Sequence, residues 1–176
     1  MTGVEVRALG ASPEVEAQLA TLLVETVAQG GSVGFMHPLG HAEALDFWRG
    51  AMEAAAQGRR VVLGAWAGPA LVGTVSLLLE TPPNQPHRAE IAKMMTRPDW
   101  RGRGVASALL HAAEALARAR GRSLLVLDTA TDGGAAGLYE RLGYQFAGEI
   151  PDYALKPHGG LTGTQLYYKR LDPAGG

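Results

Sequence analysis

The sequence contains no cysteine, so disulfide bonds, thiolate metal sites and a cysteine nucleophile are all excluded. An excess of charge of one sign is also missing. The 16 basic and 17 acidic residues give a formal net charge of −1, which argues against a nucleic-acid-binding surface. No apolar run reaches the roughly 18 residues that a membrane span needs, and the first residues lack the pattern of a signal peptide. We therefore expect a cytoplasmic protein that binds neither nucleic acid nor membrane.

The length fits one domain over residues 1–176, and a hydrophobic share of 47% allows a substantial core. Helical and strand-like patterns alternate along the chain, which predicts an α/β fold. Helices are predicted at 13–28, 41–57, 105–119 and 133–142. Strands are predicted at 4–8, 60–67, 71–80, 90–96, 124–127, 144–150 and 164–171, and the end at 173–176 is expected to be loose.

The segment Arg101-Gly102-Arg103-Gly104-Val105-Ala106 carries the clearest chemical signal. It lies between a predicted strand and a predicted helix, where the first helical N–H groups lack partners and the helix dipole is positive. Glycine lets the backbone approach a phosphate, and arginine adds positive charge. We interpret the turn as a pyrophosphate site, with an ordinary surface loop as the alternative. Because the chain has no Walker lysine signature and no full dinucleotide fingerprint, ATP and NAD are weaker candidates than another phosphate-bearing cofactor.

Two motifs, taken in this order, resemble the GCN5-related N-acetyltransferase (GNAT) superfamily. Arg101, Gly104 and Ala106 match its acetyl-CoA signature, Arg/Gln-x-x-Gly-x-Gly/Ala, and Leu138–Tyr144 matches its later Leu-Tyr-Glu-x-x-Gly-Phe/Tyr helix. The resemblance covers the chain from about residue 60 to residue 171. A closer likeness is to acetyltransferases of the tabtoxin-resistance type, which acetylate a small amine-bearing toxin. It rests on the segments Val33–Met36, Ala89–Lys93, Leu127–Thr129 and Gly148–Tyr153.

The resemblance implies an α/β fold of GNAT type, a twisted and splayed mixed sheet of about six to seven strands flanked by about four helices. It implies acetyl-CoA as cosubstrate, with the thioester in an opening between the strands that end near Thr96 and Asp128. The pantetheine arm is expected to pair with the backbone of Met94, Met95 and Thr96, and core packing is the alternative for the methionine side chains. A backbone N–H near Met94 or Met95 is the expected oxyanion donor. The expected pyrophosphate contacts are Arg101, Gly102, Arg103, Gly104, Val105 and Ala106.

Direct acetyl transfer to an amine is the expected reaction. An ammonium has no lone pair, so the amine needs a proton acceptor, and the leaving thiolate benefits from a proton donor. The resemblance assigns the donor to Tyr139, for which packing on the sheet is the alternative. Glu90 and Asp128 are the candidate bases, because partial burial near the opening would raise the pKa of a carboxylate. The alternatives are pairing of Glu90 with Arg88 or Lys93, and a turn-capping role for Asp128.

One position departs from the family pattern. Many members carry an asparagine about seven residues before the helix tyrosine, and this sequence has Asp132 there. Aspartate lacks the amide donor that contacts pantetheine in those members. Asp132 is therefore expected either to make that contact in another way or, as the preferred interpretation, to N-cap the helix.

The acceptor side is expected to lie at two loops. Phe35, Met36 and His37 belong to an apolar loop rich in helix breakers and are expected to line the acceptor pocket, with a lid packed on the first helices as the alternative. Asp152, in a predicted loop at 150–153, is expected to attract a cationic substrate from the opposite wall, with a plain surface turn as the alternative. No metal site is expected, because the five histidines lack usable ligand spacing.

The expected partner is a small-molecule amine, toxin-like or antibiotic-like, and the chain is expected to be a monomer or a homodimer. Four other functions remain open at this point. They are a non-catalytic CoA-binding sensor, a peptide N-terminal acetyltransferase, a structural interaction module, for which the sequence has no dedicated feature, and a nucleotide-dependent oxidoreductase. The last is disfavoured because the glycine turn falls in mid-chain after a hairpin.

Overall fold

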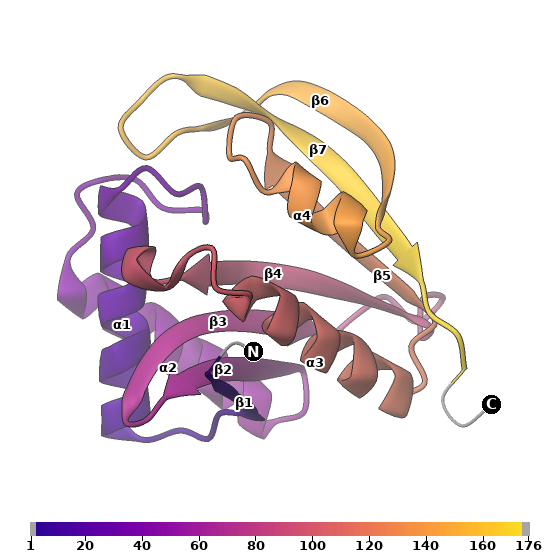
Figure 1. Ribbon diagram of the computed structural model, residues 1–176, viewed down its shortest axis with the longest axis horizontal. Helices are drawn as coiled ribbons and strands as arrows, with labels where there is room; N and C mark the ends of the chain where they lie inside the picture. The colour runs from indigo at the N-terminus through magenta and orange to yellow at the C-terminus, as the bar shows by residue number, and fades with distance from the viewer. Residues whose placement is uncertain (1–2, 174–176) are drawn as a thin grey trace.

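The computed structural model describes residues 3–173. Its strands form one mixed sheet in the order β1-β2-β3-β4-β5-β7-β6, in which only the pair β4–β5 is parallel (Figure 1). The strands are β1 (Glu5–Ala8), β2 (Arg60–Ala67), β3 (Ala70–Leu78), β4 (Arg88–Thr96), β5 (Leu124–Ala130), β6 (Gln145–Leu155) and β7 (Leu161–Arg170).

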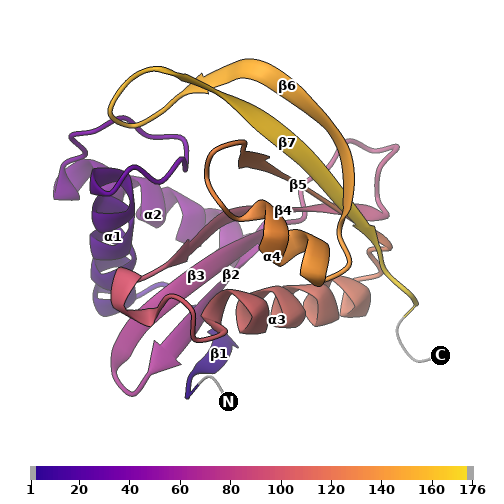
Figure 2. The same ribbon diagram turned by 45° about the horizontal axis from the view of Figure 1, so that its top comes forward.

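Helices cover both faces of this sheet. α1 and α2 bury one apolar cluster against one face, whereas α3 and α4 bury a second cluster against the other (Figures 1 and 2). The helices are α1 (Pro13–Ala28), α2 (His41–Ala56), α3 (Val105–Ala119) and α4 (Ala136–Arg141), with a short 3-10 helix η1 (Pro98–Trp100) before α3. This seven-stranded sheet with four α-helices confirms the predicted fold class. Within residues 3–173, no helix has the length and apolar character of a membrane span.

Local sequence signals set several of these boundaries. α1 begins at Pro13, whose fixed φ suits a first turn, and the Ser12 hydroxyl caps it by accepting a hydrogen bond from Val15 N at 3.1 Å. α3 covers the predicted residues 105–119. It ends just before Gly121, whose φ of +73° is a conformation that favours glycine. The predicted bounds of α1 and α3, which have start or stop signals next to an apolar helical face, are therefore confirmed.

Four predicted boundaries toward the C-terminal end are wrong. β5 continues to Ala130 and does not end at 127, and β7 begins at Leu161 and not at 164. α4 begins at Ala136 and not at 133, and Ala135 is its N-cap residue without any side-chain hydrogen bond. β6 continues to Leu155 and does not end at 150, because β7 pairs with it across two bulges. Asp152 consequently lies in a strand and not in the predicted loop. The predicted loose end falls, from residue 174 onward, outside the described residues.

The sheet opens between β4 and β5. Their parallel pairing runs only from Arg88↔Leu124 to Glu90↔Val126. Beyond it, β4 stays paired with β3 as far as Thr96, while β5 follows β7, so that the two strands diverge (Figure 1). The opening that the resemblance implies is thus confirmed, and residues 91–96 of β4 have no partner on β5.

Candidate active site

β4 contains a β-bulge directly beside the opening. Lys93 and Met94 together oppose the single residue Val75 of β3. Lys93 has a φ of +54°, a left-handed conformation that costs a non-glycine residue about 1–2 kcal/mol. A bulge leaves one residue outside the regular ladder and changes the direction of nearby side chains, and bulges are frequent beside active sites. The backbone at this point is therefore available to a bound molecule.

The side chains and the backbone of the predicted cofactor contacts on β4 have different surroundings. Met95 is buried in the cluster under α1 and α2, and Met94 packs against the cluster under α3 and α4. Core packing is thus confirmed for both methionine side chains. The backbone of Met94, Met95 and Thr96 belongs to the part of β4 that lacks a β5 partner, where an extended arm can add as a strand.

The glycine turn leads into an uncapped helix. Gly102 and Gly104 have φ values of +73° and +81°, so both positions need the conformation that favours glycine. Gly104 is the N-cap residue of α3, and no side chain caps this end or places an acid in its first turn. The exposed Arg101 and Arg103 flank the turn, and the Arg103 guanidinium lies 4.7 Å from the ring centroid of Trp100. Free N–H groups, the helix dipole and two cations fit a phosphate group.

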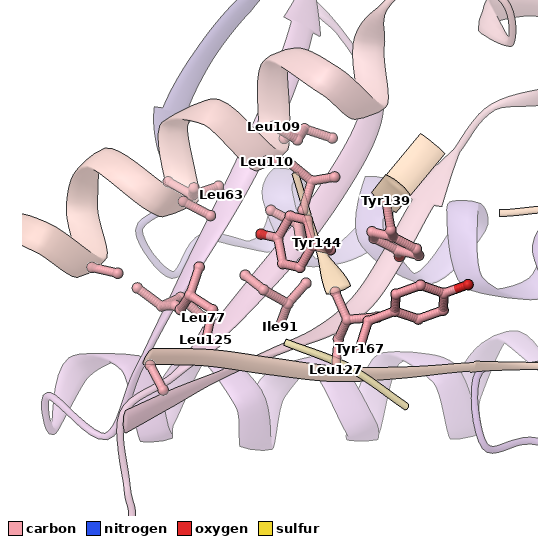
Figure 3. Packing of buried hydrophobic residues seen from close by; sticks show 14 of the residues in the cluster. Leu63, Leu77, Ile91, Leu109, Leu110, Leu125, Leu127, Tyr139, Tyr144 and Tyr167 are labelled. Carbon is pink, nitrogen blue, oxygen red and sulfur yellow. The ribbon is translucent and has the colours of Figure 1, made fainter. Parts of the chain in front are cut away.

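Tyr139 extends from α4 into the core among other tyrosines (Figure 3). Its ring centroid lies 5.7 Å from that of Tyr144 and 6.1 Å from that of Tyr167, and the residue is only 5% exposed. Burial, assisted by the negative charge of Asp128, raises the pKa of the Tyr139 phenol to about 12. The phenol therefore keeps its proton throughout the neutral range and can donate a hydrogen bond. The packing role expected as the alternative is confirmed, and it is compatible with donation.

The two candidate bases lie on the same face of the sheet at the opening. Glu90 is half-buried at the last paired position, opposite Val126. Asp128 follows two residues later on β5, so its side chain faces the same way as that of Val126. Asp128 is exposed and accepts a hydrogen bond from the Thr164 hydroxyl at 2.8 Å. The expected partial burial is confirmed for Glu90 and wrong for Asp128, because the diverging β4 does not cover Asp128.

The alternative roles of these acids are not observed. Arg88 and Lys93 donate their side-chain hydrogen bonds to groups other than Glu90. Asp128 lies inside β5, which continues to Ala130, so it does not cap a turn. Within residues 3–173, Glu90 thus forms no hydrogen bond or ion pair with Arg88 or Lys93, although its charge attracts the Lys93 ammonium, and Asp128 has no turn to cap.

The loop between α1 and α2 meets the tip of the β6–β7 hairpin. His37 N donates a hydrogen bond to the Pro157 carbonyl at 2.9 Å, and His158 Nε2 lies 2.9 Å from the Ala28 carbonyl. The rings of His37 and His158 lie 4.3 Å apart between centroids. Two segments that are distant in the sequence thus lie side by side (Figures 1 and 2).

The other predicted residues of this loop have different surroundings. Phe35 packs edge-on against Phe47 of α2, with 5.2 Å between ring centroids, whereas Met36 is 47% exposed. Phe35 thus anchors the loop on α2, as the lid alternative expected, and Met36 is free to contact another molecule.

Comparison with known proteins decides which family this arrangement belongs to. The profile of the Acetyltransferase (GNAT) family matches residues 19–144 of the 176. The chain is a GNAT acetyltransferase. It is accordingly an N-acetyltransferase with acetyl-CoA as its cosubstrate, which confirms the activity and the cosubstrate that the two motifs implied.

Solved structures of other GNAT acetyltransferases share this fold. Ribosomal-protein-alanine N-acetyltransferase from Brucella melitensis has a TM-score of 0.81 at 19% identity, covering 95% of this chain and 99% of the other. A GCN5-related N-acetyltransferase from Kribbella flavida has a TM-score of 0.78 at 21% identity, covering 96% and 98%. An aminoglycoside 6'-N-acetyltransferase complexed with coenzyme A has a TM-score of 0.74 at 17% identity, covering 98% and 99%.

Two site residues of this GNAT acetyltransferase lie elsewhere than predicted. Asp132 does not cap α4, because its carboxylate accepts a hydrogen bond from Thr162 at 2.9 Å and pairs with Lys156 at 3.3 Å. The hydrogen bond from Thr162 is the main reason why the pKa of Asp132 lies below its usual range. Asp152 is exposed on β6 with a φ of +53°, at one of the strand's bulges. Its part in substrate attraction stays a prediction, as does a pantetheine contact by Asp132.

Sequence reasoning missed two residues at the opening, Lys93 and Thr164. Thr164 fixes one oxygen of Asp128, and no local signal marks it, since it comes from a distant strand. Lys93 did leave a signal, because it is a single cation within the otherwise apolar run Ile91–Met95. Its position in the bulge explains how a strand of the core accommodates a charge there.

Val105 and Ala106 open α3 as predicted, but their side chains turn toward the protein. Val105 is buried and Ala106 is half-buried. Any contact with a diphosphate at these two positions must therefore come from the backbone N–H groups.

Proposed function

We propose that this GNAT acetyltransferase transfers the acetyl group to the primary amine of a small molecule. The observation that supports a small acceptor is the contact of His37 and His158 between the α1–α2 loop and the β6–β7 hairpin. Two segments joined in this way leave less room for a protein chain than an open groove would. The likeness of four segments to acetyltransferases of the tabtoxin-resistance type supports the same class, a toxin-like or antibiotic-like amine.

In this proposal the cosubstrate is held mainly by backbone groups. The glycine turn and the first N–H groups of α3 bind the diphosphate, with Arg101 and Arg103 adding charge. The unpaired edge of β4 at 94–96 binds the pantetheine arm. Acetyl-CoA supplies the activated acetyl group. A backbone N–H near Met94 or Met95, next to the bulge of β4, donates to the developing oxyanion.

Glu90 and Asp128 accept the proton of the acceptor ammonium in this proposal. An alkyl ammonium has a pKa of about 10.4, so at neutral pH nearly all of the acceptor must lose a proton before it can attack. Asp128 is exposed and oriented by Thr164, while Glu90 is half-buried on the neighbouring strand. Either acid, directly or through a water molecule, provides the acceptor that the reaction needs.

Tyr139 stabilises the leaving sulfur in this proposal. Its phenol, with a pKa of about 12, holds its proton more tightly than a thiol with a pKa of about 8.5. Complete proton transfer to the thiolate is therefore uphill. Hydrogen-bond donation from Tyr139 supplies the stabilisation without that transfer.

Thiol release from acetyl-CoA with a panel of acceptors tests the proposal. The panel contains amino-acid-like amines, an aminoglycoside, a polyamine and a peptide with an N-terminal alanine. We expect turnover well above the rate without acceptor for at least one small amine, with the acetylated product identified by mass spectrometry. Acetylation of the peptide alone would contradict a small-molecule acceptor, and CoA binding without turnover of any amine would favour a sensor.

A further inference from the structure

Lys93 stands in a backbone conformation that glycine would adopt more easily. Within residues 3–173, only Lys93 and Asp152 combine a positive φ with a side chain. Asp152 is exposed on an edge strand, whereas Lys93 lies in the middle of the sheet at the bulge of β4. A strained residue in such a place is retained when its side chain has a task.

The Lys93 side chain reaches out of the sheet to the α1–α2 loop. Its Nζ donates a hydrogen bond to the Val33 carbonyl at 2.8 Å. It also lies 5.9 Å from the ring centroid of Phe35 and 5.6 Å from that of Phe47. A Cβ added to Gly34 would lie 3.2 Å from the same nitrogen. The ammonium therefore occupies the space directly under the loop, beside residues 33–35.

The charges around Lys93 belong to the proposed reaction site. Asp128 and Glu90 both attract the ammonium, while Arg60 repels it. The ammonium thus feels the charges of both candidate bases while it is hydrogen-bonded to the loop. Its pKa is lowered, chiefly by burial, but the hydrogen bond to Val33 and the two rings both favour the charged form.

We propose that Lys93 is a positioning residue that fixes residues 33–36 as the wall of the acceptor pocket and thereby determines which amines are accepted. This inference rests on the proposed function. The bulge turns the Lys93 side chain toward the loop. β4, which carries Glu90 and borders the opening, therefore also holds the loop that forms the wall of the acceptor pocket. The strain at Lys93 is the cost of that connection.

The glycine variant separates this role from a contribution to folding. Lys93→Gly relieves the positive φ and removes the connection to the loop, whereas Lys93→Met removes the ammonium but keeps the strain and the side-chain bulk. We expect the Tm of Lys93→Gly to stay at or above that of the wild type. Both variants should raise the acceptor KM about tenfold, with kcat and the acetyl-CoA KM within about twofold of wild type. Lys93→Arg retains a cation and donors, so it should recover part of the loss.

Hydrogen exchange gives a readout that does not depend on finding an acceptor. In Lys93→Met and Lys93→Gly, the amides of residues 33–36 should exchange faster than in the wild type, while those of α3 stay unchanged. The matched control is Arg7→Met, which removes a cation lying 4.6 Å from the ring of Trp66 on the far edge of the sheet and should change neither measurement.

The outcomes separate the proposed function from the proposed role of Lys93. If the wild type acetylates no amine, the proposed function fails, and the exchange rates alone decide the role of Lys93. Unchanged exchange in residues 33–36 overturns the inference, as does an unchanged acceptor KM in both variants of an active enzyme. A Tm of Lys93→Gly well below the wild type, with weakened acetyl-CoA binding, also overturns it, because it shows a structural role.

Discussion

The two sides of the opening are built in different ways. The proposed cofactor side comes from one continuous stretch, β4 followed by the glycine turn and α3, and its main features are backbone features. The proposed acceptor side brings together the α1–α2 loop, Phe47 of α2, Lys93 of β4 and the tip of the β6–β7 hairpin. These four segments meet only in the folded chain, and side chains take part in most of their contacts.

This difference follows from what each side must recognise. A diphosphate and an extended arm can be bound by N–H and C=O groups, which every residue provides, so the sequence needs only glycine where the backbone is unusual. An acceptor amine is selected by a pocket of side chains, and that pocket depends on tertiary contacts. Substitutions on the two sides should therefore affect different kinetic constants.

The largest effect is expected at Tyr139. Tyr139→Phe keeps the packed ring and removes the proton that we propose stabilises the leaving sulfur, so kcat should fall about 100-fold. Acetyl-CoA affinity should stay nearly unchanged, which calorimetric titration checks beside the steady-state rates. Equal kcat in the two proteins would remove Tyr139 from the mechanism.

Smaller losses are expected at the two candidate bases. Glu90→Gln and Asp128→Asn should each lower kcat at neutral pH by about tenfold, less than a sole general base would, because either acid can replace the other. Each change should flatten the rise of the rate with pH, and the double variant should flatten it most. In the wild type, Tyr139 has a pKa of about 12 and should add no falling limb at moderately alkaline pH. If the rising limb survives in the double variant, the base is elsewhere or bulk water suffices.

A change confined to the cofactor side is expected at Gly104. Gly104→Ala places a Cβ at a φ of +81° at the start of α3, and Gly121→Ala does the same at +73° just after its end. Both should lower the free energy of unfolding by about 1 kcal/mol. Only Gly104→Ala should weaken CoA binding, by about fivefold in a calorimetric titration, because the N–H groups at the start of α3 are the proposed donors to the diphosphate. Equal CoA affinities in the two variants would show that the turn does not bind the diphosphate.

The smallest effect is expected at Tyr144, which belongs to neither side. Among the described residues its buried hydroxyl has no hydrogen-bond partner, so Tyr144→Phe should be neutral or stabilising by about 1 kcal/mol at pH 7. Burial raises its pKa, so its neutral form contributes stability below the unfolded-state value of about 10. That stability is lost as the pH rises through the folded-state value. Above about pH 10, the Tm of Tyr144→Phe should therefore fall less steeply with rising pH than the Tm of the wild type. A parallel fall of the two Tm values would contradict this.

Much of the cofactor side could be predicted from the sequence. The glycine turn, the helix at 105–119 and the strand before them follow from local rules of capping, glycine and apolar period, and the two GNAT motifs gave their order. The role of Asp132 could not be predicted in the same way. Its side chain suits an N-cap, but Thr162 and Lys156, which come from the later β-hairpin, compete for it and hold it outside α4.

The acceptor side shows the same limit more strongly. Phe35 and His37 were identified from an apolar loop with breakers, yet their partners Phe47 and His158 lie in distant segments. Lys93 was missed because a bulge changes the direction of a side chain without any change in the sequence period around it. Local patterns in the sequence thus do not predict which side chains from distant segments come into contact.

Hydrogen exchange of the wild type with and without CoA tests the central claim most directly, because it observes the backbone donors themselves. We predict slower exchange on CoA binding for the amides of residues 91–96 and 102–107, and little change for those of residues 33–36. No slowing at the start of α3, under conditions in which CoA is bound, would contradict a cofactor side built from the backbone of β4 and the glycine turn.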